Sequence, residues 1–203
     1  IVKINGRGVQ RLRSNYSNIL NSKSNLEDYV VAGMKSYLRY WIDTFRFPRW
    51  NRERIISTVI CEGEELLRKP ISEGRGVVVA LPHAGNWDHA GAYFCSTGIP
   101  LTTVAEHLEP EKLFRKFLEY RQNIGMEVLD LNSRSIATLS QRARSGKLVA
   151  LVADRDLSQS GIEVQLSGLS AKFPAGPALL AIQTGAALIT AYVRYEKDGI
   201  RIL

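Results

Sequence analysis

The 203-residue sequence has few of the residues that build disulfide frameworks, metal centres or membrane spans. It contains two cysteines and three histidines. Cys61 and Cys95 show no metal-binding or redox spacing, so they are interpreted as small core residues, and a disulfide framework is not indicated. No uninterrupted apolar run approaches the roughly 20 residues that a helix needs to cross a bilayer.

The signatures of several enzyme classes are also missing. There is no G-x-S-x-G nucleophile elbow, no P-loop and no H-E-x-x-H zinc motif. Residue types alone allow a metal site built from His83, Asp88, His89 and His107. However, His89 directly follows Asp88 on an expected helix, where neighbouring side chains point about 100° apart. We therefore expect neither a metal ion nor a resident cofactor.

The length and the hydrophobic fraction of 45% suit one globular domain. The sequence starts with Ile1 rather than Met and stops at Leu203 without an evident tail. We expect residues 1–203 to form a single domain that is trimmed at both ends from a longer protein.

The excess positive charge lies near the N-terminus. Residues 1–54 contain eleven Lys and Arg against four Asp and Glu, which gives this segment a net charge of +7. The whole chain also has a net charge of +7, so the remainder is neutral. A basic segment of this kind suits a surface that meets anionic lipid or nucleic acid.

Two amphipathic helices are expected in the basic segment, over residues 8–20 and 26–45. In the second, apolar and aromatic residues recur at steps of three and four, and residues 24–27 fit a capping box. This apolar face can pack on a core or lie on a membrane interface, and the helix offers one face for each. Nucleic-acid binding is disfavoured because the Tyr and Trp side chains fall on the apolar stripe, where they would pack rather than stack on bases.

The rest of the chain alternates between strands and helices. Strands are expected at 77–81, 101–105, 126–129, 148–152 and 187–194, and helices at 51–69, 87–95, 111–124, 135–145 and 178–184. A loop rich in Asp, Ser and Gly is expected after the strand at 148–152. This alternation predicts an α/β fold with a largely parallel central sheet flanked by helices. In such sheets, ligands bind beyond the carboxyl ends of the strands.

The first candidate site residues are His83 and Asp88. His83 follows a buried strand, and Asp88 falls in the first turn of the next helix, where its charge suits the helix dipole. A strand-to-helix bend can bring the two together. A carboxylate on one imidazole nitrogen fixes the tautomer and leaves the other nitrogen free as a base. Because no enzyme nucleophile accompanies them, a substrate hydroxyl would be the nucleophile. From spacing alone, a capping Asp beside a packing His is the alternative.

Two more charged groups follow strand ends. Glu106 comes after the strand at 101–105, with Arg121 in the following helix, and Asp154 and Arg155 come after the strand at 148–152. Each set taken singly could be a solvated loop. Because both groups begin just after strand ends, where ligands bind, we predict that these four residues bind substrate.

The H-x4-D element of residues 81–88 resembles the signature of glycerolipid and lipid A acyltransferases, although many lipid A enzymes have Glu in place of Asp88. Four blocks in order are more specific, and they resemble the actinobacterial phosphatidylinositol mannoside acyltransferases within the lipid A late acyltransferase and lysophospholipid acyltransferase superfamily. The blocks are MKSYLRYW (34–41), LPHAGNWDHAGAY (81–93), VADRDL (152–157) and FPAGPALLAIQTGAAL (173–188).

This resemblance implies a glycerolipid-acyltransferase-like fold, an acyl-CoA co-substrate and a mannose hydroxyl of a phosphatidylinositol mannoside as acceptor. It also implies peripheral attachment to the cytoplasmic face of the plasma membrane, with an anionic membrane surface, rather than nucleic acid, as partner. His83 would be the general base and Asp88 its orienting carboxylate. By the same resemblance Glu106, Arg121 and Asp154 would line the acceptor or support the dyad. Relatives look longer, and residues 131–135 look short for a family loop.

Two alternatives stay open at this stage. One is a lipid A-type late acyltransferase that takes its acyl group from an acyl carrier protein. The other is a non-catalytic lipid-binding or membrane-scaffold protein, for which His83 would be dispensable.

Overall fold

The computed structural model describes residues 5–20, 25–106, 109–156 and 160–203. The chain divides into two compact units. One consists of residues 1–49 together with Ser167–Leu169, and the other of Trp50–Leu166 together with Ser170–Leu203. None of the described helices is both long and apolar enough to cross a membrane.

The N-terminal unit contains the two predicted amphipathic helices, α1 (Arg7–Ile19) and α2 (Leu26–Arg46), followed by a short 3-10 turn at Phe47–Arg49. A Cβ atom at Gly33 of α2 would lie 2.8 Å from the hydroxyl of Tyr16 of α1, so glycine permits the close approach of the helices. Arg13 and Glu27 pair across the same contact. Residue 24, which the predicted capping box requires, lies outside the described residues.

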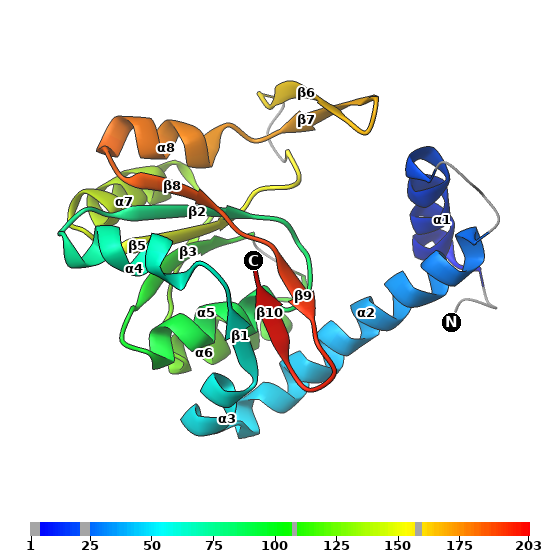
Figure 1. The fold of residues 1–203 in the computed structure, drawn as a ribbon, viewed down its shortest axis with the longest axis horizontal. Coiled ribbons are helices and arrows are strands. Elements are labelled where there is room, and N and C mark those ends of the chain that lie inside the picture. Colours follow the sequence, from blue (N-terminus) through cyan, green and yellow to red (C-terminus); the bar gives the residue numbers. More distant parts are fainter. Residues whose placement is uncertain (1–4, 21–24, 107–108, 157–159) are drawn as a thin grey trace. The chain divides into compact units, whose positions relative to one another are not determined.

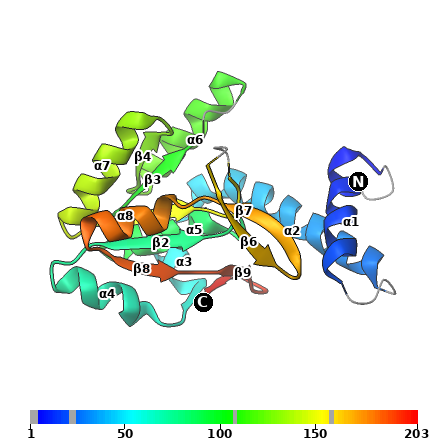
Figure 2. The same ribbon diagram turned by 90° about the horizontal axis from the view of Figure 1, so that it is seen from above.

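The second unit is built on a five-stranded parallel sheet with the strand order β4-β3-β5-β2-β8. Figure 1 labels β3, β5, β2 and β8, and Figure 2 labels β4 beside β3. The sheet confirms the predicted α/β fold. Its strands are β2 (Val77–Leu81), β3 (Leu101–Ala105), β4 (Glu127–Asp130), β5 (Leu148–Val152) and β8 (Ala187–Thr190). The helices that follow or precede them are α4 (Glu64–Ser72), α5 (Trp87–Ser96), α6 (Glu111–Asn123), α7 (Ser133–Arg144) and α8 (Gly176–Thr184).

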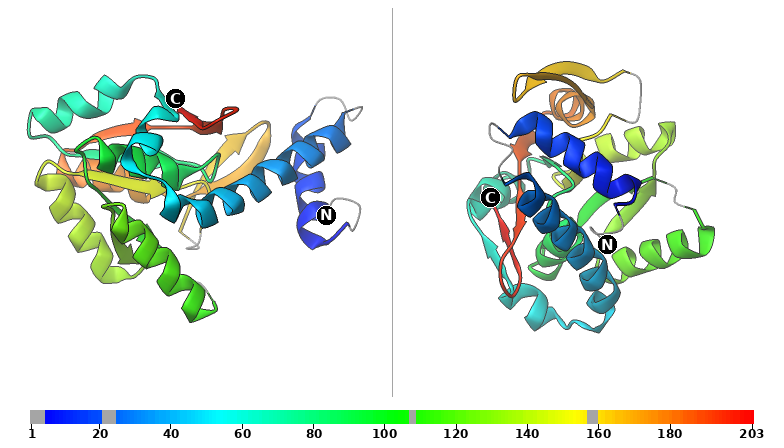
Figure 3. Two further views of the ribbon diagram at one scale, coloured as in Figure 1. Left: turned by 90° about the horizontal axis from the view of Figure 1, so that it is seen from below. Right: turned by 90° about the vertical axis from the view of Figure 1, so that its right-hand side faces the viewer.

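Both faces of the central strands are covered, which explains why these strands are continuous apolar runs. Val78 and Val149 face one layer, where they pack with residues of α7 and α8. Val77 and Leu148 face the other layer, with residues of α4 and α5. Figure 2 shows α8 over the sheet from above, and Figure 3 shows the opposite face from below, with α5 in front of it.

The prediction of a single helix over residues 51–69 is wrong. That stretch forms α3 (Arg52–Ser57), β1 (Val59–Cys61) and the start of α4. The strand forms because Val59–Cys61 pairs in parallel with β10 (Ile200–Ile202), a partner about 140 residues away that local periodicity cannot reveal. Gly63 then turns the chain with φ at +66°, and α4 begins at Glu64.

Two further predictions are corrected at the C-terminal end. The strand expected at 187–194 is interrupted, and β9 (Val193–Tyr195) leaves the large sheet to pair antiparallel with β10. The segment expected to be a loop contains a hairpin of β6 (Ile162–Leu166) and β7 (Leu169–Phe173), which forms its own two-stranded sheet.

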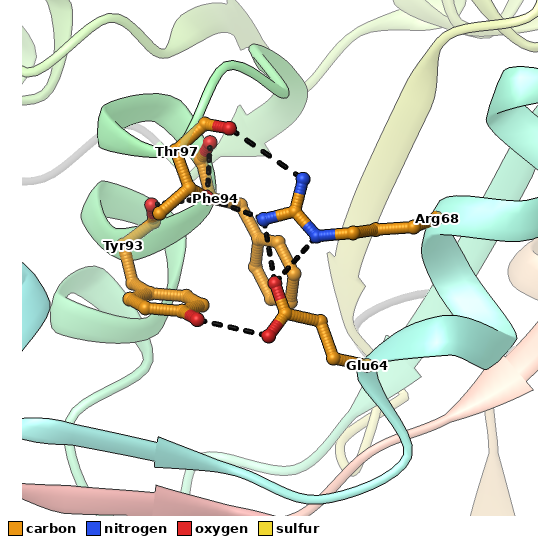
Figure 4. A network of polar contacts seen from close by, with 5 residues as sticks. All are labelled: Glu64, Arg68, Tyr93, Phe94 and Thr97. Carbon is orange, nitrogen blue, oxygen red and sulfur yellow. Dashed lines mark hydrogen bonds and ion pairs between the residues drawn. The ribbon is translucent and has the colours of Figure 1, made fainter.

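A polar network fixes α5 against α4, as seen from close by in Figure 4. Arg68 donates from Nε to Glu64 Oε1 at 2.6 Å and from Nη2 to Thr97 Oγ1 at 2.8 Å. The Tyr93 hydroxyl donates to Glu64 Oε2 at 2.9 Å. Burial is the larger cause and this hydrogen bond to a carboxylate is the next; together they raise the pKa of Tyr93 to about 12. The phenol therefore stays a neutral donor. The network holds the C-terminal half of a helix whose N-terminus carries Asp88.

Candidate active site

The sheet register brings His83 and Asp154 together. β2 and β5 are neighbours, and Leu81 is the partner of Val152 at their carboxyl ends. His83 and Asp154 each lie two residues beyond these partners. Their side chains meet with His83 Nδ1 2.6 Å from Asp154 Oδ1. An ionised carboxylate can only accept, so Nδ1 carries a hydrogen, and in the neutral imidazole the free lone pair is then on Nε2.

Asp154 is held in its charged form. Burial raises the pKa of its carboxyl. The hydrogen bond from His83, the charge of His83 and the backbone N–H groups of His83 and Asp154 lower the pKa by more, so the net pKa falls below the ordinary value. The two side chains keep 36% and 29% of their surface exposed. A charged Asp154 carboxylate is therefore bonded to an imidazole that a substrate can reach from solvent.

The loop after β2 limits how His83 can move. The Trp87 ring meets the imidazole edge-on, with ring centroids 5.0 Å apart and planes at 87°. Gly85 has φ at +59°, and a Cβ atom there would come within 2.5 Å of the carbonyl oxygen of Val193 in β9. Only glycine combines that backbone conformation with so close an approach, so the loop is seated directly on β9.

Asp88 occupies a different environment from the one that its spacing suggested. It lies in the first turn of α5, and only 3% of its surface is exposed. Arg121 of α6 donates from Nε to Asp88 Oδ1 at 2.8 Å and from Nη2 to Oδ2 at 3.3 Å. We expected Asp88 to orient His83, whereas in the structure Asp154 makes the hydrogen bond to Nδ1 and Asp88 pairs with Arg121. A catalytic role for Asp88, and a substrate-binding role for Arg121, stay predictions.

Arg121→Ala is expected to destabilise the protein by about 3 kcal/mol, because it leaves the buried Asp88 carboxylate without its guanidinium partner. For a chain of this size, that corresponds to a fall in Tm of roughly 6–12 °C, which thermal unfolding would measure. The matched control on the same helix is Arg115→Ala, which breaks an exposed pair with Glu111. This exposed pair is worth about 1 kcal/mol or less. Equal Tm values for the two variants would contradict a stabilising Asp88–Arg121 pair.

The other two predicted site residues lie on the loops at the same edge of the sheet. Glu106 directly follows β3, Arg155 follows Asp154, and both side chains are exposed. His107 lies outside the described residues. Within the described part of the chain, no group of three or more His, Cys, Asp and Glu side chains could hold a metal ion.

Comparison with known proteins identifies the family. The family of bacterial lipid A biosynthesis acyltransferases matches residues 1–202. The phosphatidylinositol mannoside acyltransferase of Mycolicibacterium smegmatis is 39% identical over 197 residues, which cover 95% of this chain and 65% of that relative. The protein of the same name from Mycobacterium tuberculosis is 37% identical over 199 residues, or 95% of this chain and 63% of the relative.

The chain thus spans slightly less than two thirds of the length of these relatives. The matched range, residues 1–202, extends across both compact units. The match confirms the resemblance that the four sequence blocks indicated: this chain belongs to the family of bacterial lipid A biosynthesis acyltransferases.

Proposed function

We propose that the protein is a membrane-associated acyltransferase that moves a fatty acyl group from acyl-CoA to a mannose hydroxyl of a phosphatidylinositol mannoside. The observation that carries the proposal is the hydrogen bond between His83 Nδ1 and Asp154 at the carboxyl edge of the sheet. The names of the relatives support the acceptor, because proteins 37–39% identical to this chain are phosphatidylinositol mannoside acyltransferases. We place the reaction at the cytoplasmic face of the plasma membrane, where acyl-CoA is available.

His83 acts as the general base in this proposal. Its Nε2 takes the proton of the acceptor hydroxyl while the hydroxyl oxygen attacks the thioester carbonyl carbon. The C–S bond then breaks, and the imidazolium returns the proton to the departing thiolate. The products are the new ester and free CoA thiol, so no covalent enzyme intermediate is required. Asp154 stabilises the transient imidazolium and keeps the tautomer that presents Nε2.

The charged residues at the sheet edge suit the acceptor. The exposed Arg155 guanidinium can bind a phosphate with two parallel hydrogen bonds, and the Glu106 carboxylate can accept from sugar hydroxyls. Arg121 is already paired with Asp88 through Nε and Nη2. We therefore propose that Arg121 supports the acceptor site by holding Asp88, rather than by binding the acceptor directly.

The N-terminal unit supports association with a membrane. Tyr37, Ile42 and Phe45 on α2 expose 55%, 49% and 67% of their surface. The Tyr37 ring meets Trp41 edge-on and the Phe45 ring stacks on Trp41, both with centroids 6.2 Å apart, so the aromatic residues form a continuous ladder along the helix. Aromatic side chains of this kind suit the interface between headgroups and acyl chains.

Binding to vesicles is expected to be stronger with anionic than with neutral lipid, and this difference is expected to shrink as salt is added. The basis is the net charge of +7 on residues 1–54, since each Lys or Arg near an anionic surface contributes about 1 kcal/mol and the field fades over about 10 Å at 0.1 M salt. The bound fraction is measured by sedimentation with neutral and anionic vesicles from about 0.05 to about 0.5 M salt. Equal, salt-insensitive binding to both vesicle types would contradict the electrostatic attachment.

The function is tested by product analysis. The protein is offered acyl-CoA, or the same acyl chain on acyl carrier protein, together with phosphatidylinositol mannosides, phosphatidylinositol or a lipid A precursor, and the products are identified by mass spectrometry. We expect acylated mannoside, formed from acyl-CoA. Acylation of the lipid A precursor from acyl carrier protein would instead favour the late lipid A reaction, and binding of acceptors without any ester product would favour a lipid-binding protein.

A further inference from the structure

The β6–β7 hairpin has an apolar surface that the proposed reaction does not use. Along β6, the apolar residues Ile162, Val164 and Leu166 alternate with the polar residues Glu163 and Gln165. Because side chains of a strand alternate between its two faces, the three apolar residues share one face. They expose 57%, 36% and 50% of their surface.

This hairpin is not part of either larger sheet among the described residues. Ser167 and Gly168 have φ at 52° and 78°, the positive values of a tight two-residue hairpin turn. On the polar face, the Ser170 hydroxyl donates to Glu163 at 2.5 Å. A two-stranded hairpin in water is marginally stable at best, so its apolar face gains most from a surface that removes it from water.

The hairpin is attached at the edge of the sheet that carries the active site. β5 ends at Val152, and Asp154 follows directly. The Asp156 carboxylate accepts a hydrogen bond from the Gly161 N–H at 2.9 Å, one residue before β6. β7 leads through Pro174 into the N-terminus of α8, which runs back across the sheet before the parallel strand β8 begins (Figure 1). Both ends of the hairpin therefore connect to the carboxyl edge, where His83 and Asp154 meet.

We propose that the apolar face of β6 inserts into the outer acyl-chain region of a lipid bilayer and so holds the active-site edge against the surface that contains the acceptor. The proposal rests on the proposed function, because a lipid acceptor requires the enzyme to work at a membrane. The hairpin face measures roughly 16 Å by 10 Å from strand dimensions, or about 160 Å², far below the roughly 800 Å² per partner of a stable protein interface. This small area argues against a second protein chain as the occupant.

Charge distinguishes this contact from that of the N-terminal helices. The excess positive charge of the chain lies in residues 1–54, and Glu163 and Lys172 balance each other in the hairpin strands. The hairpin contact is therefore expected to persist at high salt and to need no anionic lipid, whereas the attachment of the N-terminal segment weakens with salt.

The first test compares two double variants of the same strand pair. Val164→Ser/Leu166→Ser removes apolar surface, and Gln165→Ser/Lys172→Ser changes the opposite face. Transfer from acyl-CoA is measured with the acceptor in vesicles and with the same acceptor in detergent micelles. We expect the apolar-face variant to lose about tenfold or more in rate on vesicles, since a buried Val or Leu side chain contributes strongly to partitioning. Its rate in micelles, and both rates of the polar-face variant, should change less than twofold.

Insertion is measured directly with tryptophan. Leu166→Trp and Gln165→Trp are mixed at 0.5 M salt with phosphatidylcholine and phosphatidylinositol vesicles that contain brominated phosphatidylcholine, and emission beyond that of the three native tryptophans is followed. Quenching of the Trp at 166 but not of that at 165 is expected.

Equal quenching of the two, or equal vesicle rates of the two double variants, would overturn the hairpin proposal and leave the acyltransferase proposal standing. Absence of transfer by the unmodified protein in both vesicles and micelles would sink the proposed function, while the quenching result would still decide the hairpin.

Discussion

His83→Ala is expected to lower the rate of acyl transfer by about a hundred- to ten-thousand-fold without unfolding the protein. That is the usual contribution of a positioned general base. The fold should survive because the imidazole is about one-third exposed, so its removal opens no sealed cavity and lets water solvate Asp154. Steady-state rates with acyl-CoA and acceptor, read beside thermal unfolding, measure both effects.

His89→Ala is the informative comparison for this variant. His89 is almost completely buried, and its Nε2 lies 3.1 Å from the carbonyl oxygen of Ile55 and 3.3 Å from Thr58 Oγ1. Its removal is expected to lower the Tm, because it deletes a buried ring and leaves a buried carbonyl without that donor. A His83→Ala protein that keeps near-normal turnover would remove His83 from the chemistry. A large drop in its Tm would instead make it a structural residue.

The parts of the fold that could be predicted are those whose sequence patterns depend on local structure. The runs at 77–81 and 148–152 are apolar because both faces of the parallel sheet are covered, and they were identified with the correct bounds. Asn86 is also of a residue type that typically caps helices, and its side chain accepts a hydrogen bond from the His89 N–H. These features need no knowledge of distant residues.

The missed elements have two causes: one strand depends on a partner far away in the sequence, and the other has a weak local pattern. Val59–Cys61 looks like helix until β10 is placed beside it. The β6 strand is short and polar at alternate positions, and it follows a stretch of Asp, Ser and Gly that is typical of loops. Its alternation of apolar and polar residues was the signal available for a strand, although five residues of alternation are a weak pattern.

The site shows the same division between local and long-range information. The spacing of His83 and Asp88 is a local pattern, so it suggested a dyad within one loop. The partner of Nδ1 is decided by strand order instead, because β5 lies next to β2 with Leu81 opposite Val152. Asp154 was identified as a site residue from its place after a strand. Its contact with His83 could not be predicted because the sequence does not state which strands are neighbours.

Asp154→Asn and Asp88→Asn are expected to have effects of different kinds. Asp154→Asn should lower the transfer rate by about a thousandfold or more with little change in Tm. An asparagine can present its NH₂ group to Nδ1, which favours the tautomer that lacks a free Nε2, and an analogous change in a catalytic triad costs about 10⁴-fold. Asp88→Asn should mainly lower the Tm, because Arg121 loses its charged partner in a buried setting.

The two variants are compared by measuring kcat and KM for both substrates, together with thermal unfolding, under identical conditions. In the arrangement seen here, the loss in kcat is larger for Asp154→Asn and the loss in Tm is larger for Asp88→Asn. Donor and acceptor KM values should change little in Asp154→Asn, since orientation of His83 acts on the chemical step rather than on binding. The reverse pattern, with a collapse of kcat in Asp88→Asn and a nearly unchanged kcat in Asp154→Asn, would restore Asp88 as the carboxylate that orients His83 during catalysis. It would also require the loop from Pro82 to Trp87 to rearrange when substrates bind.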